Sequence, residues 1–473
     1  MVRNASESVI RISERNPHYY SYRGKELLLL TSAEHYGAVM NGKFDYRAYL
    51  DALSRFGLNY TRIYPATAVL IQGMNRKNDN LAPGPDLIAP WARSDVPGYI
   101  GGGNKFDLGR WDDEFFRRLD DFMRCAHERD IIVELCFFNS QHERSYPYSP
   151  LHPDANIQGV GTPGHAEVET LQDKNLVQVQ LELIEKLIIE TNQYDNLIYE
   201  FCDEPTLDGT KGSEATAWLS ALIDRAIKVE DQLPKKHLLA QQVMIGVDFS
   251  GDDRIGVNVA QYVSVSAGQI GGLPALNNSY WKGKPLEMNE TLSALSDPVY
   301  YEGDVVAASR IEAWEFMMGG GAGFNQLNAC FTVQNPAGNH PVNHEILTGL
   351  GNLRNFIESM DFAKMTRDSR TIQALSVGGS ANGISEAGRQ YAFYLHHCFT
   401  NYRRWHPSHY VPTPGLYNTV ITIKIDPGEY LLQFINPADL SVLSSQIITS
   451  DGEDMDIQCP EYTLDIAFKI TRN

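Results

Sequence analysis

The chain has 473 residues, 43% of them hydrophobic and 21% charged, which excludes disorder or a coiled coil as its main organisation. Lys and Arg together number 40 against 59 Asp and Glu, for a formal net charge of −19. Such an acidic chain repels phosphate backbones and anionic lipid headgroups, so neither nucleic acid nor a membrane is expected as a partner.

Strands and helices alternate from the N-terminus to about residue 355. Residues 9–22 alternate in polarity and predict a short hairpin before the first long strand. Apolar runs predict eight strands, at 27–31, 60–64, 131–138, 197–202, 238–244, 257–265, 285–289 and 323–327. Amphipathic stretches predict helices at 46–56, 111–126, 176–188, 214–229, 305–318 and 342–359. This alternation predicts a (β/α)8 TIM barrel rather than an open doubly wound sheet.

Two long loops follow the second and third predicted strands, at 65–110 and 139–170. Both leave the carboxyl ends of their strands, the face on which barrel enzymes build their active sites. Loops of this length in a compact domain are usually functional. We expect them to wall the barrel mouth into a pocket.

The sequence pattern changes after residue 366. Helical periodicity stops, and short alternating segments follow, at 391–395, 420–425, 430–434, 442–448 and 463–470. Turn-forming residues separate these segments, which is typical of a β-sandwich. We therefore expect two domains, a barrel with its N-terminal hairpin at 1–366 and an all-β sandwich at 367–473.

Two glutamates close predicted strands of the barrel. Glu204 ends the fourth strand before Pro205, and Glu290 ends the seventh, 86 residues later. A barrel uses about 31 residues per strand–helix unit, so this spacing places them across the mouth. Side-chain alternation turns Glu290 inward and leaves Glu287 facing a helix. Facing carboxylates suit glycoside hydrolysis, in which one protonates the leaving oxygen and the other attacks the anomeric carbon.

The segment 198–205, Ile-Tyr-Glu-Phe-Cys-Asp-Glu-Pro, resembles the Tyr-Glu-x-x-Asn-Glu-Pro fingerprint of clan A retaining glycoside hydrolases, especially cellulase-like glycoside hydrolase family 5. Residues 16–37 are similar to bacterial cellulase-like hydrolases in which a β-sandwich follows the barrel. The resemblance covers the barrel. It implies a retaining O-glycosyl hydrolase with Glu204 as acid/base and Glu290 as nucleophile, acting without a cofactor on an oligosaccharide or glycoside.

The same resemblance implies that Arg62 orients the nucleophile and that Tyr262 touches it. Two departures from the family pattern concern substrate binding. Asp203 replaces the Asn that holds the sugar 2-hydroxyl, and an ionised Asp accepts hydrogen bonds but donates none. Residues 324–326, Phe-Asn-Gln, stand where the family has a Trp platform on the eighth strand.

Further candidates for substrate binding come from the strand ends and loops. Glu34 and His35 end the first strand, Asn139 opens the loop after the third strand, and Trp91 in the proline-rich loop is the best candidate for stacking on a sugar. We expect Glu200 to lie inside the barrel, satisfied by Arg62.

Two other functions stay open. A metal-dependent barrel hydrolase would use His35, Glu34 and the carboxylates, although no second His–carboxylate pair has ligand spacing and no metal ligand is assigned. A non-catalytic carbohydrate-binding barrel is the other, which Asp203 makes conceivable. Within the favoured function, a walled pocket points to exo-action on oligosaccharides, while the sugar, linkage, anomer and oligomeric state stay undetermined.

The first ten residues, MVRNASESVI, contain no apolar segment, so no signal peptide is visible. The sequence therefore predicts a cytoplasmic protein, or a secreted or periplasmic one whose leader has been removed.

Overall fold

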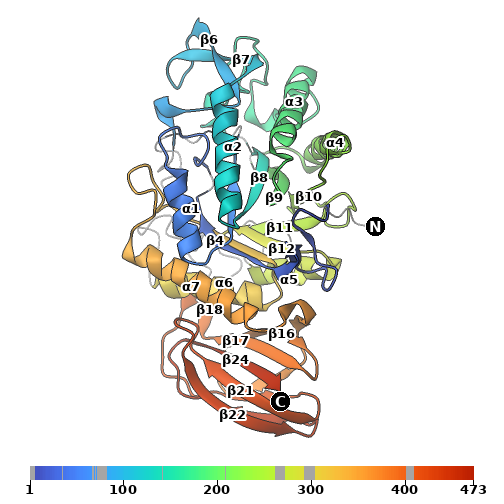
Figure 1. Ribbon diagram of the computed structural model, residues 1–473, viewed down its shortest axis with the longest axis vertical. Coiled ribbons are helices and arrows are strands. Elements are labelled where there is room, and N and C mark those ends of the chain that lie inside the picture. The colour runs from blue at the N-terminus through green and yellow to red at the C-terminus, as the bar shows by residue number, and fades with distance from the viewer. Residues whose placement is uncertain are drawn as a thin grey trace.

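The computed structural model describes residues 6–34, 36–65, 69, 71, 82–140, 142–207, 209–244, 246–261, 272–291, 304–400 and 410–473. Figure 1 shows a barrel of strands ringed by helices, with a β-rich part below it at the C-terminal end of the chain.

The barrel wall is one sheet of eight parallel strands. They are β4 (Leu29–Ala33), β5 (Tyr60–Ile63), β8 (Ile132–Asn139), β9 (Leu197–Asp203), β10 (Leu238–Gln242), β11 (Val257–Gln261), β12 (Leu286–Glu290) and β13 (Gly323–Leu327). Neighbours follow chain order from β5 to β13, and β13 pairs with β4. Asn59 bridges the remaining gap, because its side chain accepts from the Leu30 amide at 3.0 Å and donates to the Leu28 carbonyl at 2.9 Å. The predicted barrel is confirmed.

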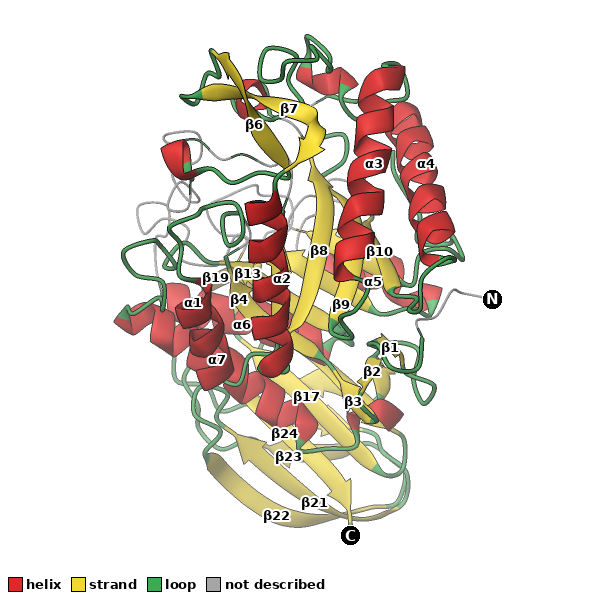
Figure 2. Cartoon of the chain, turned by 45° about the horizontal axis from the view of Figure 1, so that its top comes forward, coloured by secondary structure: helices red, strands yellow, loops and turns green. Residues whose placement is uncertain are grey.

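Helices cover the outer face of the strands (Figure 2). They are α1 (Tyr46–Arg55), α2 (Asp113–Glu128), α3 (Lys174–Thr191), α4 (Gly212–Glu230), α5 (Gly272–Ser279), α6 (Val305–Met318) and α7 (Pro341–Glu358). Asp45, Asp112 and Asp173 begin three of them by accepting from backbone amides of the first turn, the usual role of an N-cap aspartate. The short α5 was not predicted, because its eight residues carry too little periodicity.

Two predicted segments contain more strand than expected. The first long loop holds an antiparallel hairpin, β6 (Trp91–Pro97) with β7 (Asn104–Trp111), whose prolines and glycines hide the alternation. The N-terminal hairpin is a three-stranded antiparallel sheet of β1 (Arg11–Ile12), β2 (Tyr20–Tyr22) and β3 (Lys25–Leu27).

The C-terminal part is a sandwich of antiparallel sheets. Six strands form one sheet, in the order β14 (Thr366–Asp368), β16 (Ser380–Glu386), β17 (Gln390–His396), β24 (Asp465–Arg472), β21 (Gly428–Ile435) and β22 (Val442–Ser450). The facing sheet holds β15 (Ile372–Leu375), β20 (Val420–Ile423) and β23 (Met455–Gln458), and β18 (Cys398–Thr400) pairs with β19 (Tyr410–Pro412). Phe393, Phe468, Ile421 and Ile457 pack in one buried cluster, which confirms the predicted sandwich.

Helix α6 joins the sandwich to the barrel through buried polar contacts. Arg310 Nε donates to Asp465 Oδ2 at 2.8 Å, and the Tyr394 hydroxyl donates to the same oxygen at 2.8 Å. One turn further on, the Glu315 carboxylate accepts from the Tyr410 hydroxyl and lies 3.2 Å from His396 Nε2. Separating the two parts would leave these charges unpaired. The boundary between 366 and 367 stays a prediction.

Within the described residues, no helix combines the length and the hydropathy needed to cross a bilayer.

Candidate active site

Arg62 on β5 is the centre of a polar cluster at the carboxyl ends of the barrel strands. Its side chain is fully buried. The guanidinium donates from Nε to Glu200 Oε2 at 2.7 Å and from Nη2 to Asp203 Oδ1 at 2.8 Å, and Nη1 lies 3.5 Å from Glu290 Oε2. Nη1 also donates to the Tyr64 hydroxyl. The expected pairing of Glu200 with Arg62 is confirmed, and one cation serves three carboxyl groups from two other strands.

Asp203, the last residue of β9, is held from three sides. Its Oδ1 accepts from Arg62 and from Gln261 Nε2, and its Oδ2 accepts from Asn139 Nδ2 at 2.6 Å. Asp203 is completely buried, and Asn139 and Gln261 are the last residues of β8 and β11. Donors from three strands therefore fix a carboxylate where the family fingerprint has an Asn.

Glu204 sits in a strained turn directly after β9. Its φ is +49°, and that of Thr206 is +80°, a region that a β-branched residue rarely adopts. The Glu204 amide donates to the side-chain oxygen of Gln242 at 2.5 Å, and the Thr206 amide lies 3.5 Å from Glu169 Oε2. Such strain persists where the surroundings over-determine the backbone, and it clusters at functional sites. Glu204 is only 5% exposed.

Glu290 reaches the cluster through a β-bulge. The register between β11 and β12 pairs Ala260 with Met288 and then Gln261 with Glu290, so Asn289 is an extra residue. The Glu287 side chain points into the barrel, because its Oε2 lies 3.1 Å from the Tyr60 hydroxyl on β5. The predicted alternation is therefore wrong in this strand: Glu287 does not face a helix, and the bulge turns Glu290 toward Arg62.

Burial dominates the electrostatics of Glu290. It raises the pKa of this carboxyl to about 8, and the charge of Asp203 acts in the same direction, while Arg62 and a hydrogen bond from Tyr64 oppose the rise. Because Arg62 also serves Asp203 and Glu200, it does not fully compensate the burial of Glu290.

Two tyrosines complete the cluster: Tyr36 directly follows the candidates Glu34 and His35 in the sequence, and sequence reasoning missed Tyr64. Burial raises the pKa of Tyr36, and the negative charges of Glu290, Asp203 and Glu204 raise it further. The Tyr36 hydroxyl therefore interacts electrostatically with both candidate catalytic glutamates and with Asp203. The Tyr36 ring lies 5.0 Å from the Tyr64 ring. Tyr64 follows Arg62 by two residues, so strand alternation was the one signal that could have found it.

Glu34 is bound by its own backbone turn. Its carboxylate accepts from the Tyr36 amide at 2.7 Å and from the Gly37 amide at 3.0 and 3.2 Å. Burial raises its pKa to about 7, against the effect of these hydrogen bonds. In this structure Glu34 shapes the turn that carries Tyr36. His35 and Tyr262, the other candidates near the mouth, lie outside the described residues.

Trp91 does not offer a platform for a sugar ring. It begins β6, is 1% exposed and packs on Trp111 with ring centroids 5.9 Å apart. The expected stacking role is contradicted because the hairpin buries the indole.

The two long loops pack on each other, as a wall would. The Tyr99 hydroxyl donates to the Tyr148 carbonyl at 2.7 Å, and the Phe106 amide donates to the Ala155 carbonyl at 2.9 Å. Hairpin β6–β7 and the loop after β8 are therefore one structural unit.

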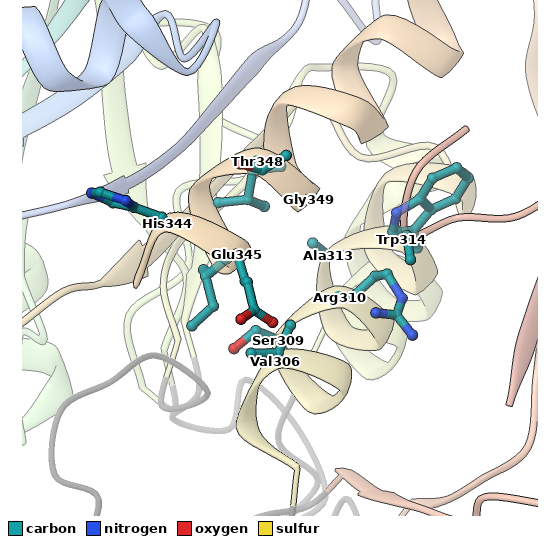
Figure 3. Close-up of a pocket in the computed structure, with 12 residues that line it drawn as sticks. Val306, Ser309, Arg310, Ala313, Trp314, His344, Glu345, Thr348 and Gly349 are labelled. Carbon is teal, nitrogen blue, oxygen red and sulfur yellow. The ribbon is translucent and has the colours of Figure 1, made fainter. Parts of the chain in front are cut away.

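A cavity of about 280 Å³ lies elsewhere, between α6 and α7 (Figure 3). Arg310 and Trp314 line it from α6, His344 and Glu345 from α7, and Ala438 from the sandwich. It is thus a space between helices, separate from the strand-end cluster.

In the part of the chain that the structure describes, no group of three or more His, Cys, Asp or Glu side chains is arranged to hold a metal ion.

Comparison with solved structures identifies the fold. A glycoside hydrolase family 5 protein from Bacteroides vulgatus matches with a TM-score of 0.61 and 13% identity, covering 98% of this chain and 94% of that one. A second glycoside hydrolase gives 0.59 and 13%, covering 98% and 97%. The endo-1,4-β-mannanase from Rhizomucor miehei gives 0.50 and 12%, covering 74% and 100%. The chain therefore shares the barrel fold of these glycoside hydrolases, the fold that its resemblance to clan A implied.

No protein-family model and no curated protein sequence matches the chain.

Proposed function

We propose that this protein is a retaining glycoside hydrolase. The observation that carries the proposal is the meeting of Glu290, Asp203 and Arg62 at the carboxyl ends of the strands, next to the strained turn of Glu204. The family 5 fold supports it, because barrel enzymes place their chemistry on this face.

The proposed reaction needs one of the two carboxyl groups protonated and the other ionised. Glu204 donates its proton to the leaving oxygen while the Glu290 carboxylate attacks the anomeric carbon, which breaks the glycosidic bond and forms a glycosyl ester. Glu204 then takes a proton from water, and the resulting hydroxide displaces Glu290 and restores both groups. Arg62 and Tyr64 favour the ionised form of Glu290 that the first step requires.

The packing of the two long loops on each other supports exo-action on short oligosaccharides, because both loops leave the carboxyl face of the barrel. Hairpin β6–β7 and the loop after β8 are bound together, and such a wall closes one side of a cleft. Solved structures of similar fold include an endo-1,4-β-mannanase, so β-mannosides and β-glucosides are the first substrates to test, each as an aryl glycoside and as an oligosaccharide.

The acid/base assignment is tested with Glu204→Ala. A nitrophenolate leaving group needs no proton, so the variant should still form the glycosyl-enzyme from activated aryl glycosides and then stall. Azide needs no base and should restore turnover, giving a glycosyl azide that keeps the substrate's anomeric configuration. An azide of inverted configuration would mean direct attack on the substrate, without Glu290. A folded variant that azide does not rescue would make Glu204 structural.

Two inexpensive measurements separate the other functions. Hydrolysis by the wild type should survive treatment with a chelator, and a loss that added metal reverses would favour a metal-dependent hydrolase. Sugar binding without turnover of any glycoside in the panel would favour a carbohydrate-binding barrel.

A further inference from the structure

Two more carboxyl groups lie deeper in the barrel, on the side of the N-terminal sheet. Glu134 on β8 and Glu287 on β12 are both fully buried. The Tyr60 hydroxyl is hydrogen-bonded to Glu134 Oε2 and lies 3.1 Å from Glu287 Oε2, and the Tyr20 hydroxyl of β2 donates to Glu287 Oε1. We call Glu134, Glu287, Tyr20 and Tyr60 the floor cluster.

The hydrogen bonds of the floor cluster are complete only if one of its carboxyl groups carries a proton. The Tyr60 hydroxyl has one hydrogen and can donate to only one of its two carboxyl neighbours. The second contact is favourable only when that carboxyl is protonated and donates to the Tyr60 oxygen. Among the described residues, Arg62 forms ion pairs with Glu200, Asp203 and Glu290. Neither Glu134 nor Glu287 forms an ion pair there. Burial accordingly raises the pKa of both, that of Glu287 to about 7.

The fold leaves room for this pair. Gly323 on β13 is the direct neighbour of Glu287 in the sheet, and a Cβ at this position would lie 2.9 Å from Glu287 Cγ. Any larger residue would push the Glu287 side chain away from Tyr60.

Asn289 links the floor cluster to the mouth. Its Nδ2 lies 3.2 Å from Glu134 Oε1 and 3.4 Å from Glu200 Oε1, and its Oδ1 accepts from Gln261 Nε2 at 3.4 Å. Asn289 is also the extra residue of the bulge in β12. The side chain that fixes the bulge is therefore adjacent in sequence to Glu290.

We infer that Asn289 is a positioning residue for Glu290, and that the Glu134–Glu287 pair, sharing one proton, is its anchor. This inference rests on the proposed function, because it takes Glu290 as the nucleophile. In a regular strand Glu287 and Asn289 would face inward and Glu290 would face the helices. Holding Asn289 against Glu134 and Glu200 keeps the extra residue inside and turns Glu290 to Arg62.

The test is the rate at which Glu290 becomes covalently labelled by 2,4-dinitrophenyl 2-deoxy-2-fluoro-β-glucoside and -β-mannoside, followed by intact mass and peptide mapping. Asn289→Ala should lower the limiting labelling rate by about 100-fold, the effect of a misplacement of about 1 Å, with the apparent affinity for the reagent little changed. Glu134→Ala should lower the limiting labelling rate by a similar factor. Glu134→Gln, which mimics the protonated acid, should label at nearly the wild-type rate.

Glu230→Gln is the matched control, since Glu230 is equally buried but pairs with His237 on the other side of the barrel wall. Labelling of Asn289→Ala at the wild-type rate would overturn the inference and leave the proposed function intact. Glu134→Gln as slow as Glu134→Ala would overturn the shared proton. If Glu134→Ala does not fold, the labelling rates of Asn289→Ala and Glu134→Gln still test the inference. A wild type labelled elsewhere than Glu290 would refute Glu290 as the nucleophile of the proposed function, and the inference with it.

Discussion

The mouth and the floor of the barrel both bury carboxyl groups, but among the described residues the mouth carboxyls form ion pairs with a cation and the floor carboxyls form none. At the mouth, Arg62 contacts Glu200, Asp203 and Glu290. On the floor, Glu134 and Glu287 meet tyrosine hydroxyls and an amide instead. The unfavourable burial of charge is thus offset by a guanidinium at the mouth and by a retained proton on the floor.

This difference suits the two regions to different tasks. A carboxylate beside a guanidinium can ionise and attack, whereas a carboxyl pair that shares one proton carries a single negative charge and can serve as a support. Asn289 connects the two regions, since it contacts Glu134 on the floor and precedes Glu290 at the mouth.

Substitutions of the two glutamates of β12 should show the largest difference between the mouth and the floor. Glu290→Gln removes the attacking charge and should lower kcat/KM on aryl glycosides by roughly 10⁴-fold or more. Glu287→Gln should keep activity within about tenfold, because an amide replaces a carboxyl that already shares a proton. Steady-state kinetics should be measured on both variants, with circular dichroism to check that they fold. The reverse order of losses would make Glu287 the nucleophile.

Arg62→Met would make the mouth resemble the floor by removing its cation. Glu200 and Asp203 would lose their buried cation, which should lower the free energy of unfolding by about 3–5 kcal/mol. Arg62→Lys keeps the charge but loses the planar fork, so its loss should be smaller. Urea denaturation gives both values. Equal stability of Arg62→Met and wild type would show that these carboxyls are already protonated.

Asp203→Asn tests how strongly the mouth carboxylates interact. The charge of Asp203 raises the pKa of Glu290, and its removal also frees Arg62 for Glu290. The acid limb of the kcat/KM profile should therefore move to lower pH by about one unit, because that limb reports the ionisation of the free enzyme's nucleophile. Asp154→Asn, an exposed carboxylate of the loop after β8, should leave the profile unchanged. A shift to higher pH would contradict the assignment.

The floor should also make stability depend on pH. The pKa of Glu287 is raised from its ordinary value of 4.5 to about 7 in the folded protein, so the folded state binds more protons between these pH values. Stability should consequently fall as pH rises through this window, by at most about 1.4 kcal/mol per pH unit for this group. The Tm of Glu287→Gln should fall less steeply than that of the wild type from pH 5 to 7. Parallel curves would refute the raised pKa.

Local sequence patterns were enough to predict the helices and strands and the ends of the strands that carry the candidate catalytic glutamates. Apolar runs and amphipathic periodicity are local patterns, so they predicted the eight barrel strands and the C-terminal sandwich. The Asp-Glu-Pro turn and the spacing to Glu290 placed two glutamates at strand ends by the same local logic. Alternation within a regular strand also placed Glu200 inside the barrel, whereas Arg62 was assigned through the resemblance to clan A.

The directions of the side chains at the strand ends, and the residues that they contact, depend on the tertiary structure. The inward turn of Glu290 depends on a bulge relative to β11, and the floor pair depends on Tyr20, which is 267 positions from Glu287 in the sequence. Trp91 is buried because β6 pairs with β7 across a turn rich in glycine. Alternation predicts directions within a strand, but register, bulges and proton sharing are set by residues distant in the chain.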